Sequence, residues 1–205
     1  MWVVSRHSVR LGPCLVRWTS GAKRMGVSGR RARAGFSLVE MMVVIAVLAI
    51  VLAIATPSFT GLINGNRLTA AANEFAAALQ TARSEAVRLN RQVSLCRSDD
   101  GGTKCESGST WGRWIVQASD NTVLRSSMVP SRLVVSASPL LVDKITFSPN
   151  GFAYIGPALL SGKVNICMPT TRPTENVRTV LIVGGAQASI TSSSGGGACS
   201  APSDN

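Results

Sequence analysis

The longest hydrophobic run of the chain covers residues 41–55, all of them apolar, and the mostly apolar residues 36–39 precede it. Only Glu40 interrupts the stretch, and the next charged residue is Arg67. About 20 apolar residues are needed to cross the hydrocarbon core of a bilayer as a helix. The pattern therefore predicts a membrane-spanning helical segment over residues 36–57.

Helical periodicity continues beyond this run, through residues 58–92. A removed secretory signal has a shorter apolar region that ends in small residues at the cut, so we expect a retained anchor. Pro57 and Gly61 should bend the helix without ending it, which gives roughly 55 residues and a length of about 80 Å. One face should pack on a globular head, because its apolar residues are alternately four and three apart: Leu68, Ala72, Phe75, Leu79, Ala82, Ala86, Leu89 and Val93.

After residue 92 the pattern changes to short strand-like runs with local turns. Asn150-Gly151 lies between two of these runs and is a strong hairpin signal. We therefore expect an α+β fold, in which the long N-terminal helix packs on an antiparallel β-sheet head over residues 93–190. The Ser- and Gly-rich residues 191–205 should form a flexible tail, tethered by Cys199. The expected strands are 92–96, 113–119, 122–129, 132–138, 144–148, 152–156, 163–168 and 178–185.

Charge is concentrated ahead of the hydrophobic run. Residues 1–35 contain eight basic residues and no acidic one, which leaves +3 of the total net charge of +11 for residues 36–205. A basic segment before an apolar one marks the cytoplasmic side of a membrane. Residues 1–35 are therefore expected to be a leader, and Met25 is an alternative to Met1 as its start.

The cysteines suggest an oxidising compartment. Cys14 belongs to the leader, and four others belong to the predicted head, where none shows the C-x-x-C spacing of zinc or thioredoxin sites. An even number in an exported segment favours two disulfides.

Glu40 is the residue whose position most needs an explanation. A carboxylate in hydrocarbon is costly unless it is paired or neutralised. Cleavage between Gly35 and Phe36 would create an α-ammonium group four residues before Glu40, on the same chain or on a neighbouring one. The alternative is that Glu40 lies at headgroup depth and its side chain reaches water.

The sequence GFSLVE at residues 35–40, with basic residues before it and an apolar run after it, resembles the class III signal of type IV pilins and pseudopilins. The resemblance implies cleavage after Gly35 by prepilin peptidase and N-methylation of Phe36. It also implies that Glu40 pairs with the Phe36 amine of a neighbouring subunit during assembly.

The remaining sequence is similar to the GspH/FimT group of minor pilins and pseudopilins, in the long helix followed by VSLCRSDDGGTKC, WGRWIVQAS, ITFSPNGF and VNIC. This similarity implies a single-pass bacterial inner-membrane protein with a periplasmic head, assembling with other pseudopilins or minor pilins. The leading hypothesis is a structural subunit of the type II secretion pseudopilus. The alternative is a FimT-like minor pilin of type IV pili, involved in pilus initiation and DNA uptake. The sequence does not separate the two.

Cys96 and Cys105 flank a turn that a disulfide could close, and Cys167 with Cys199 would tie the tail to the sheet. Four cysteines allow three pairings, and the sequence does not choose among them.

Other site chemistry is disfavoured by the pattern. Asp99, Asp100 and Glu106 lack the alternating spacing of a calcium loop, so we expect a solvated turn, no metal and no other cofactor. Trp111 and Trp114 are expected to pack in the core or at a sheet edge.

DNA binding and catalysis are not expected. DNA-binding FimT-like proteins carry a Gly-Arg-x-Arg element, whereas residues 185–188 read GAQA. Lys163, Arg172 and Arg178 are dispersed, and phosphate binding needs clustered basic residues. The single histidine, His7, lies in the leader, so serine or cysteine nucleophiles of the head have no histidine partner.

Overall fold

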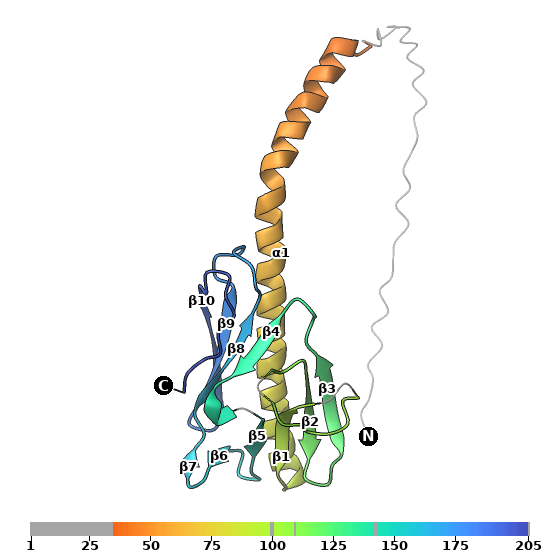
Figure 1. Cartoon of the computed structure of the whole chain (residues 1–205). Helices are drawn as coiled ribbons and strands as arrows, with labels where there is room; N and C mark the ends of the chain where they lie inside the picture. Colours follow the sequence, from red (N-terminus) through yellow and green to blue (C-terminus); the bar gives the residue numbers. More distant parts are fainter. Residues whose placement is uncertain (1–34, 99–100, 109, 142, 205) are drawn as a thin grey trace, which may run out of the picture. The chain divides into compact units, whose positions relative to one another are not determined.

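The computed structural model describes residues 35–98, 101–108, 110–141 and 143–204 (Figure 1). Residues 1–34, which hold most of the expected leader with Met25 and His7, lie outside the described residues, as do Asp99 and Asp100.

Helix α1 spans Leu38–Leu89 and is unbroken at Pro57 and Gly61, as the periodicity predicts. Its C-terminus follows from local sequence. Asn90 has a φ of 50°, the left-handed conformation that asparagine tolerates, and the Arg91 N–H donates to the Ala86 carbonyl at 3.3 Å. This is the bonding pattern of a Schellman C-cap, which satisfies carbonyls that the helix leaves open.

The strands form two four-stranded antiparallel sheets instead of the single sheet expected. One sheet has the order β3-β2-β1-β5, with bounds Val123–Met128, Arg113–Ala118, Val93–Arg97 and Lys144–Phe147. The other has the order β10-β9-β8-β4, with bounds Gln187–Ser193, Val177–Val183, Gly162–Cys167 and Val134–Ala137. A small hairpin, β6 (Tyr154–Ile155) with β7 (Ala158–Leu159), and a 3-10 turn, η1 (Pro139–Leu141), complete the head.

The core of the head lies between α1 and the two sheets. All eight residues of the predicted stripe pack there, seven of them fully buried and Leu89 partly, and Ala78 joins them. Phe75 makes edge-on contacts with Trp111 and Trp114, with ring centroids 5.6 and 6.0 Å apart. Both tryptophans are buried, which confirms their predicted core role.

The Asn150-Gly151 turn is present after β5, although its geometry differs from the simplest two-residue hairpin. The Gly151 N–H donates to the Ser148 carbonyl at 2.9 Å, so Pro149 and Asn150 occupy the central positions. Gly151 itself has a φ of 79°, a conformation that favours glycine.

The C-terminal segment is held against the head. Strand β10 continues to Ser193, so the segment expected to be a tail from residue 191 begins inside a strand. Beyond it, the Ser200 carbonyl accepts a hydrogen bond from Asn165 at 3.1 Å, and the Asp204 carboxylate accepts one from the Leu140 N–H at 3.1 Å. Most residues of β10 are small and polar, so the strand was not recognised from hydrophobic periodicity.

Candidate functional site

The residues expected to act in processing and assembly lie at the start of α1 and immediately before it. Gly35 and Phe36 precede the helix, and the Phe36 side chain is 72% exposed. The Ser37 hydroxyl accepts a hydrogen bond from the Glu40 N–H at 3.2 Å, and the Ser37 carbonyl accepts one from the Met41 N–H at 3.2 Å. Ser37 is therefore the N-cap of α1, which explains why the helix begins at Leu38 and not at Phe36.

The role of Ser37 was missed in the sequence analysis, although a signal for it was present. Ser37 and Glu40 have the S-x-x-E spacing of a capping box. Glu40 also stands in the first turn, where the partial positive charge of the helix N-terminus favours a carboxylate. The residue thus has a local role in starting the helix, in addition to any role toward a partner.

The Glu40 side chain is exposed, and it forms no ion pair with another described residue. Within the described residues the ion pairs are Arg88–Glu85, Arg91–Asp120 and Arg97–Glu106, none of which involves Glu40.

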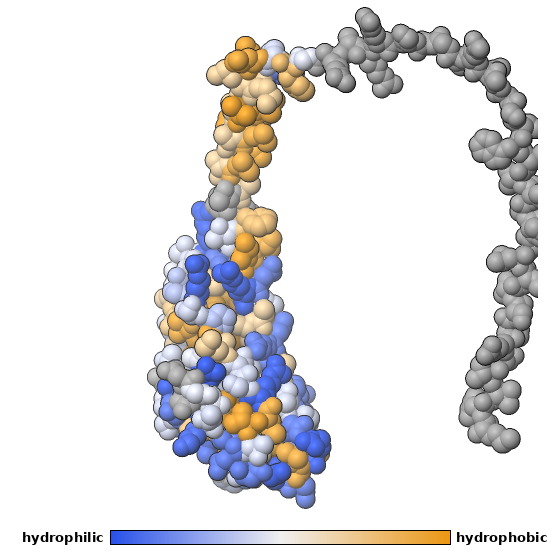
Figure 2. Space-filling view, turned by 90° about the vertical axis from the view of Figure 1, so that its right-hand side faces the viewer, coloured by the Kyte–Doolittle hydropathy of each residue, from blue (hydrophilic) through white to orange (hydrophobic). Residues whose placement is uncertain are grey.

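The helix surface that follows is apolar and exposed. From Val44 to Ile63 the large hydrophobic side chains are 40–72% exposed. Among the described residues, α1 is the one helix long and apolar enough to cross a membrane. In the space-filling view this hydrophobic surface gives way to hydrophilic surface where the head begins (Figure 2).

Two disulfides fix the head. Cys96 is bonded to Cys105, nine residues later, and Cys167 is bonded to Cys199, 32 residues later. The second bridge lies beside the buried Asn176. The amide of this side chain donates to the Met168 carbonyl at 3.0 Å, and its oxygen accepts from the Gly195 N–H at 2.7 Å. The bridge and the amide together hold the C-terminal segment on the β10-β9-β8-β4 sheet.

The loop after Cys96 is organised by an arginine. The Arg97 guanidinium donates to the Thr110 carbonyl at 2.8 Å and to the Ser107 carbonyl at 2.8 Å, and it pairs with Glu106 at 3.4 Å. Glu106, one of the three acids weighed as calcium ligands, therefore has a cation as its partner. In the part of the chain that the structure describes, no three His, Cys, Asp or Glu side chains gather as a metal site.

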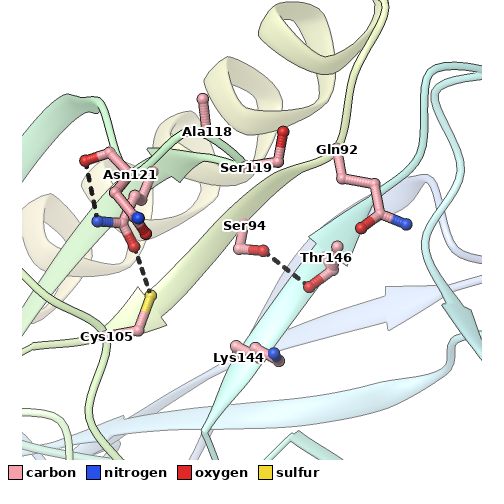
Figure 3. Close-up of a pocket in the computed structure, with 9 residues that line it drawn as sticks. Gln92, Ser94, Cys105, Ala118, Ser119, Asn121, Lys144 and Thr146 are labelled. Atoms are coloured by element: carbon pink, nitrogen blue, oxygen red, sulfur yellow. Dashed lines mark hydrogen bonds between the residues drawn. The ribbon is translucent and has the colours of Figure 1, made fainter.

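A polar concavity of about 320 Å³ lies on the β3-β2-β1-β5 sheet, beside Cys105 (Figure 3). The Ser94 and Thr146 hydroxyls are hydrogen-bonded to each other at 2.8 Å, and Gln117 donates to the Asn121 carbonyl at 3.2 Å. Among the described residues that line it, Lys144 is the one charged side chain, and none is a histidine or a carboxylate.

The residues compared with the DNA-binding element, 185–188, lie at the end of the β9–β10 turn and the start of β10. Gly185 packs so closely on Ala153, just before β6, that a Cβ there would lie 2.3 Å from the Ala153 carbonyl oxygen. The Ala186 carbonyl accepts a hydrogen bond from Arg83 at 3.3 Å. Arg178 lies elsewhere, against Thr69 of α1 at 3.4 Å, and the Arg172 carbonyl contacts Asn64 of α1 at 3.0 Å.

Comparisons with known proteins identify the family. The family of the type II transport protein GspH matches residues 71–188, more than half of the chain, and the prokaryotic N-terminal methylation motif matches residues 30–56. A solved structure of the type IV minor pilin FimU of Pseudomonas aeruginosa is 26% identical, with a TM-score of 0.47 over 62% of this chain and 89% of that one.

The minor pseudopilin EpsH from the type 2 secretion system of Vibrio cholerae is 12% identical, with a TM-score of 0.42 over 62% of this chain and 97% of that one. Comparison with curated protein sequences gave no significant match. The two family matches together assign the anchor and the head, and the chain therefore belongs to the GspH family of pilin-like proteins, the minor pseudopilins and minor pilins.

Proposed function

We propose that this protein is a minor pseudopilin, a structural and non-catalytic subunit of a type II secretion pseudopilus that serves protein secretion. The observation that carries the proposal is the division of α1. The N-terminal methylation motif is followed by an exposed apolar segment, and the second half of the same helix is packed in the core of a disulfide-bonded head.

In this proposal residues 1–35 are a leader that prepilin peptidase removes on the cytoplasmic side of the inner membrane. The new Phe36 amine is then methylated. Residues 36–57 remain in the membrane, residues 58–92 carry the head, and the head stands in the periplasm. Glu40 pairs with the Phe36 amine of a neighbouring pseudopilin, which compensates both charges in a low-dielectric environment.

Processing is tested by measuring the intact mass of the membrane-extracted protein. The wild type and Gly35→Leu are compared with Gly61→Ala as a matched control, since a Cβ at Gly61 meets nothing within 4 Å. The wild type and the control should begin at methylated Phe36, and Gly35→Leu should keep its leader. A wild-type mass that includes residues before Phe36 would refute the cleavage.

The secretion role is tested by deleting the gene and measuring both protein export and surface pili. Loss of export with normal piliation is expected, with recovery on expression of the wild type and no recovery with Gly35→Leu. Loss of pili with normal export would instead assign the protein to a type IV pilus, as a FimT-like minor pilin.

A further inference from the structure

We propose that the end of the head beside the membrane-spanning part of α1 is a docking surface for anionic phospholipid headgroups of the leaflet that the head faces. The surface is formed by four arginines from three separate parts of the chain, which we call the arginine collar: Arg67, Arg132, Arg172 and Arg178. The proposal rests on the membrane anchor, and it does not depend on cleavage at Phe36 or on pairing of Glu40.

The first collar residue belongs to α1 itself. Arg67 is exposed, and it is the first charged residue after the apolar stretch. It lies ten residues beyond residue 57, the expected end of the membrane segment, which is about 15 Å along the helix axis. The polar interface of a bilayer extends about 5–8 Å beyond the hydrocarbon core on each side. The backbone of Arg67 therefore lies just outside the headgroups, and its long apolar stem lets the guanidinium reach back toward them.

The loop between β3 and β4 brings a second guanidinium to the same place. Exposed Arg132 and Arg67 together line an open concavity of about 350 Å³, with Leu133 and Met168 among its other walls. Two guanidiniums around one concavity match the geometry of a phosphate group, which arginine binds through two parallel N–H donors.

The loop between β8 and β9 adds Arg172, and the start of β9 adds Arg178. The Arg172 carbonyl accepts a hydrogen bond from Asn64 of α1 at 3.0 Å, and the side chain of Arg172 is exposed. Arg178 Nε lies 3.4 Å from Thr69 Oγ1 of α1, and its Nη1 donates to the Glu175 carbonyl at 3.0 Å. These contacts hold the loop against the helix turns that flank Arg67.

The collar concentrates the charge of the exported chain at one end. Glu175 is the acid of the same loop, so four arginines and one glutamate give a net charge of +3, which equals the net charge of residues 36–205 as a whole. The rest of that segment is neutral overall. Anionic lipid attracts basic groups only within about a Debye length, roughly 8 Å at physiological salt, and the anchor keeps the collar inside this range.

The two exposed lysines around the disulfide Cys96–Cys105 provide a matched control. Lys104 and Lys144 line neighbouring concavities, and Lys144 shares its concavity with Gln92, just beyond the C-terminal end of α1. They thus lie by the opposite end of the head-packed half of the helix. Arg67→Gln/Arg132→Gln and Lys104→Gln/Lys144→Gln each remove two positive charges.

The test is hydrogen exchange of the full chain in nanodiscs of phosphatidylcholine alone, or of equal parts phosphatidylcholine and phosphatidylglycerol. The loops at residues 129–133 and 168–176 should exchange more slowly in the anionic discs, by about fivefold for each engaged arginine. High salt and Arg67→Gln/Arg132→Gln should abolish most of this difference, and Lys104→Gln/Lys144→Gln should keep it. Unchanged protection at β2, which holds no collar arginine and no control lysine, shows that each variant is folded.

Three results would overturn the proposal. Equal exchange rates of the two loops in both kinds of disc would show that the collar does not bind anionic headgroups. Equal loss with the lysine control would show that only net charge matters. Stronger protection by inorganic phosphate or by a DNA duplex than by phosphatidylglycerol would assign the collar to a different ligand. None of these outcomes bears on secretion, so they are separate from a failure of the proposed function.

Discussion

The two halves of helix α1 differ in what surrounds them. From Val44 to Ile63 the large hydrophobic side chains are 40–72% exposed, whereas Leu68, Phe75 and Leu79 are at most 2% exposed. The first half is apolar around its whole circumference, and the second presents an alanine-rich stripe to the sheets and polar residues elsewhere. A helix that is hydrophobic on all sides needs a membrane or another protein around it, while an amphipathic one is satisfied by its own domain. The first half of this continuous helix is thus suited to a membrane, and the second half is packed against the sheets of the head. Substitutions in the two halves should therefore have different consequences.

The largest difference between the halves should come from large-to-small substitutions. Phe75→Ala should destabilise the head by about 3–5 kcal/mol, because it leaves a cavity beside Trp111 and Trp114. Ile50→Ala, in the exposed half, should leave the unfolding of the head unchanged. Denaturant unfolding followed by tryptophan fluorescence measures both. Equal effects of the two substitutions would mean that the stripe is not the core.

Both disulfides lie in the head, so they should stabilise the head and not the exposed half of α1. Replacing Cys167 and Cys199 by serine should cost about 3–4 kcal/mol, and replacing Cys96 and Cys105 about 2–3 kcal/mol, because the Cys167–Cys199 bridge closes the longer loop. Unfolding curves under oxidising conditions test the order. Thiol labelling of the denatured, non-reduced wild type should modify none of the four, and labelling of Cys96 would show that its bridge does not form.

Small-to-large substitutions sharpen the comparison, since alanine occurs in both halves. Ala72 is fully buried, and Ala72→Leu should destabilise the head by about 1–3 kcal/mol through overpacking against the sheets. Ala49→Leu should be tolerated, because that residue is exposed. Thermal unfolding of the two variants measures the contrast. Tolerance of leucine at residue 72 would show that the helix–sheet contact is loose.

The smallest effect should come from an exposed ion pair on the second half. The hydrogen bond from Arg88 at 2.6 Å lowers the pKa of the Glu85 carboxyl, and the same contact raises the pKa of Arg88. Its slight stabilisation is present above the ordinary pKa of a glutamate and is lost as the pH falls through the lowered one. In Glu85→Gln, the free energy of unfolding of the head should therefore fall slightly less steeply as the pH is lowered. An acid dependence of head stability in Glu85→Gln that is as steep as in the wild type would contradict the assignment.

Much of this division follows from periodicity. The three–four spacing from Leu68 to Val93 identifies the buried stripe, and the unbroken run at residues 41–55 identifies the exposed half. Both patterns are strong because a helix repeats the same surroundings over many turns. The hairpin at Gly151 was visible for a similar reason, since its turn chemistry is local.

Features that depend on distant parts of the chain were less visible. Strand β10 has alternating small polar residues, and its pairing with β9, from Gln187 with Val183 to Ser193 with Val177, defines it better than its composition does. The division of the strands into two sheets was not predicted either, because sheet order is set by long-range pairing.

The candidate site was only partly visible in the sequence. Reading Glu40 by its charge alone overlooked the S-x-x-E spacing that makes Ser37 the N-cap. The gathering of Arg67, Arg132 and Arg172 around one end of the head required the fold, because these residues are far apart in the chain.

The role of Glu40 in assembly is the central claim, and cross-linking of variants to partner pilins is its most direct test. Glu40→Val removes a charge from the apolar segment, so membrane insertion and cleavage at Phe36 should persist while cross-linking and secretion fall. Glu40→Asp should be intermediate, because the charge remains on a shorter side chain. Ser37→Ala is the control: it removes the cap of α1 but keeps the carboxylate, and it should assemble far better than Glu40→Val. If Glu40→Val is processed, cross-links and supports secretion like the wild type, the carboxylate serves only to start the helix and the assembly role is wrong.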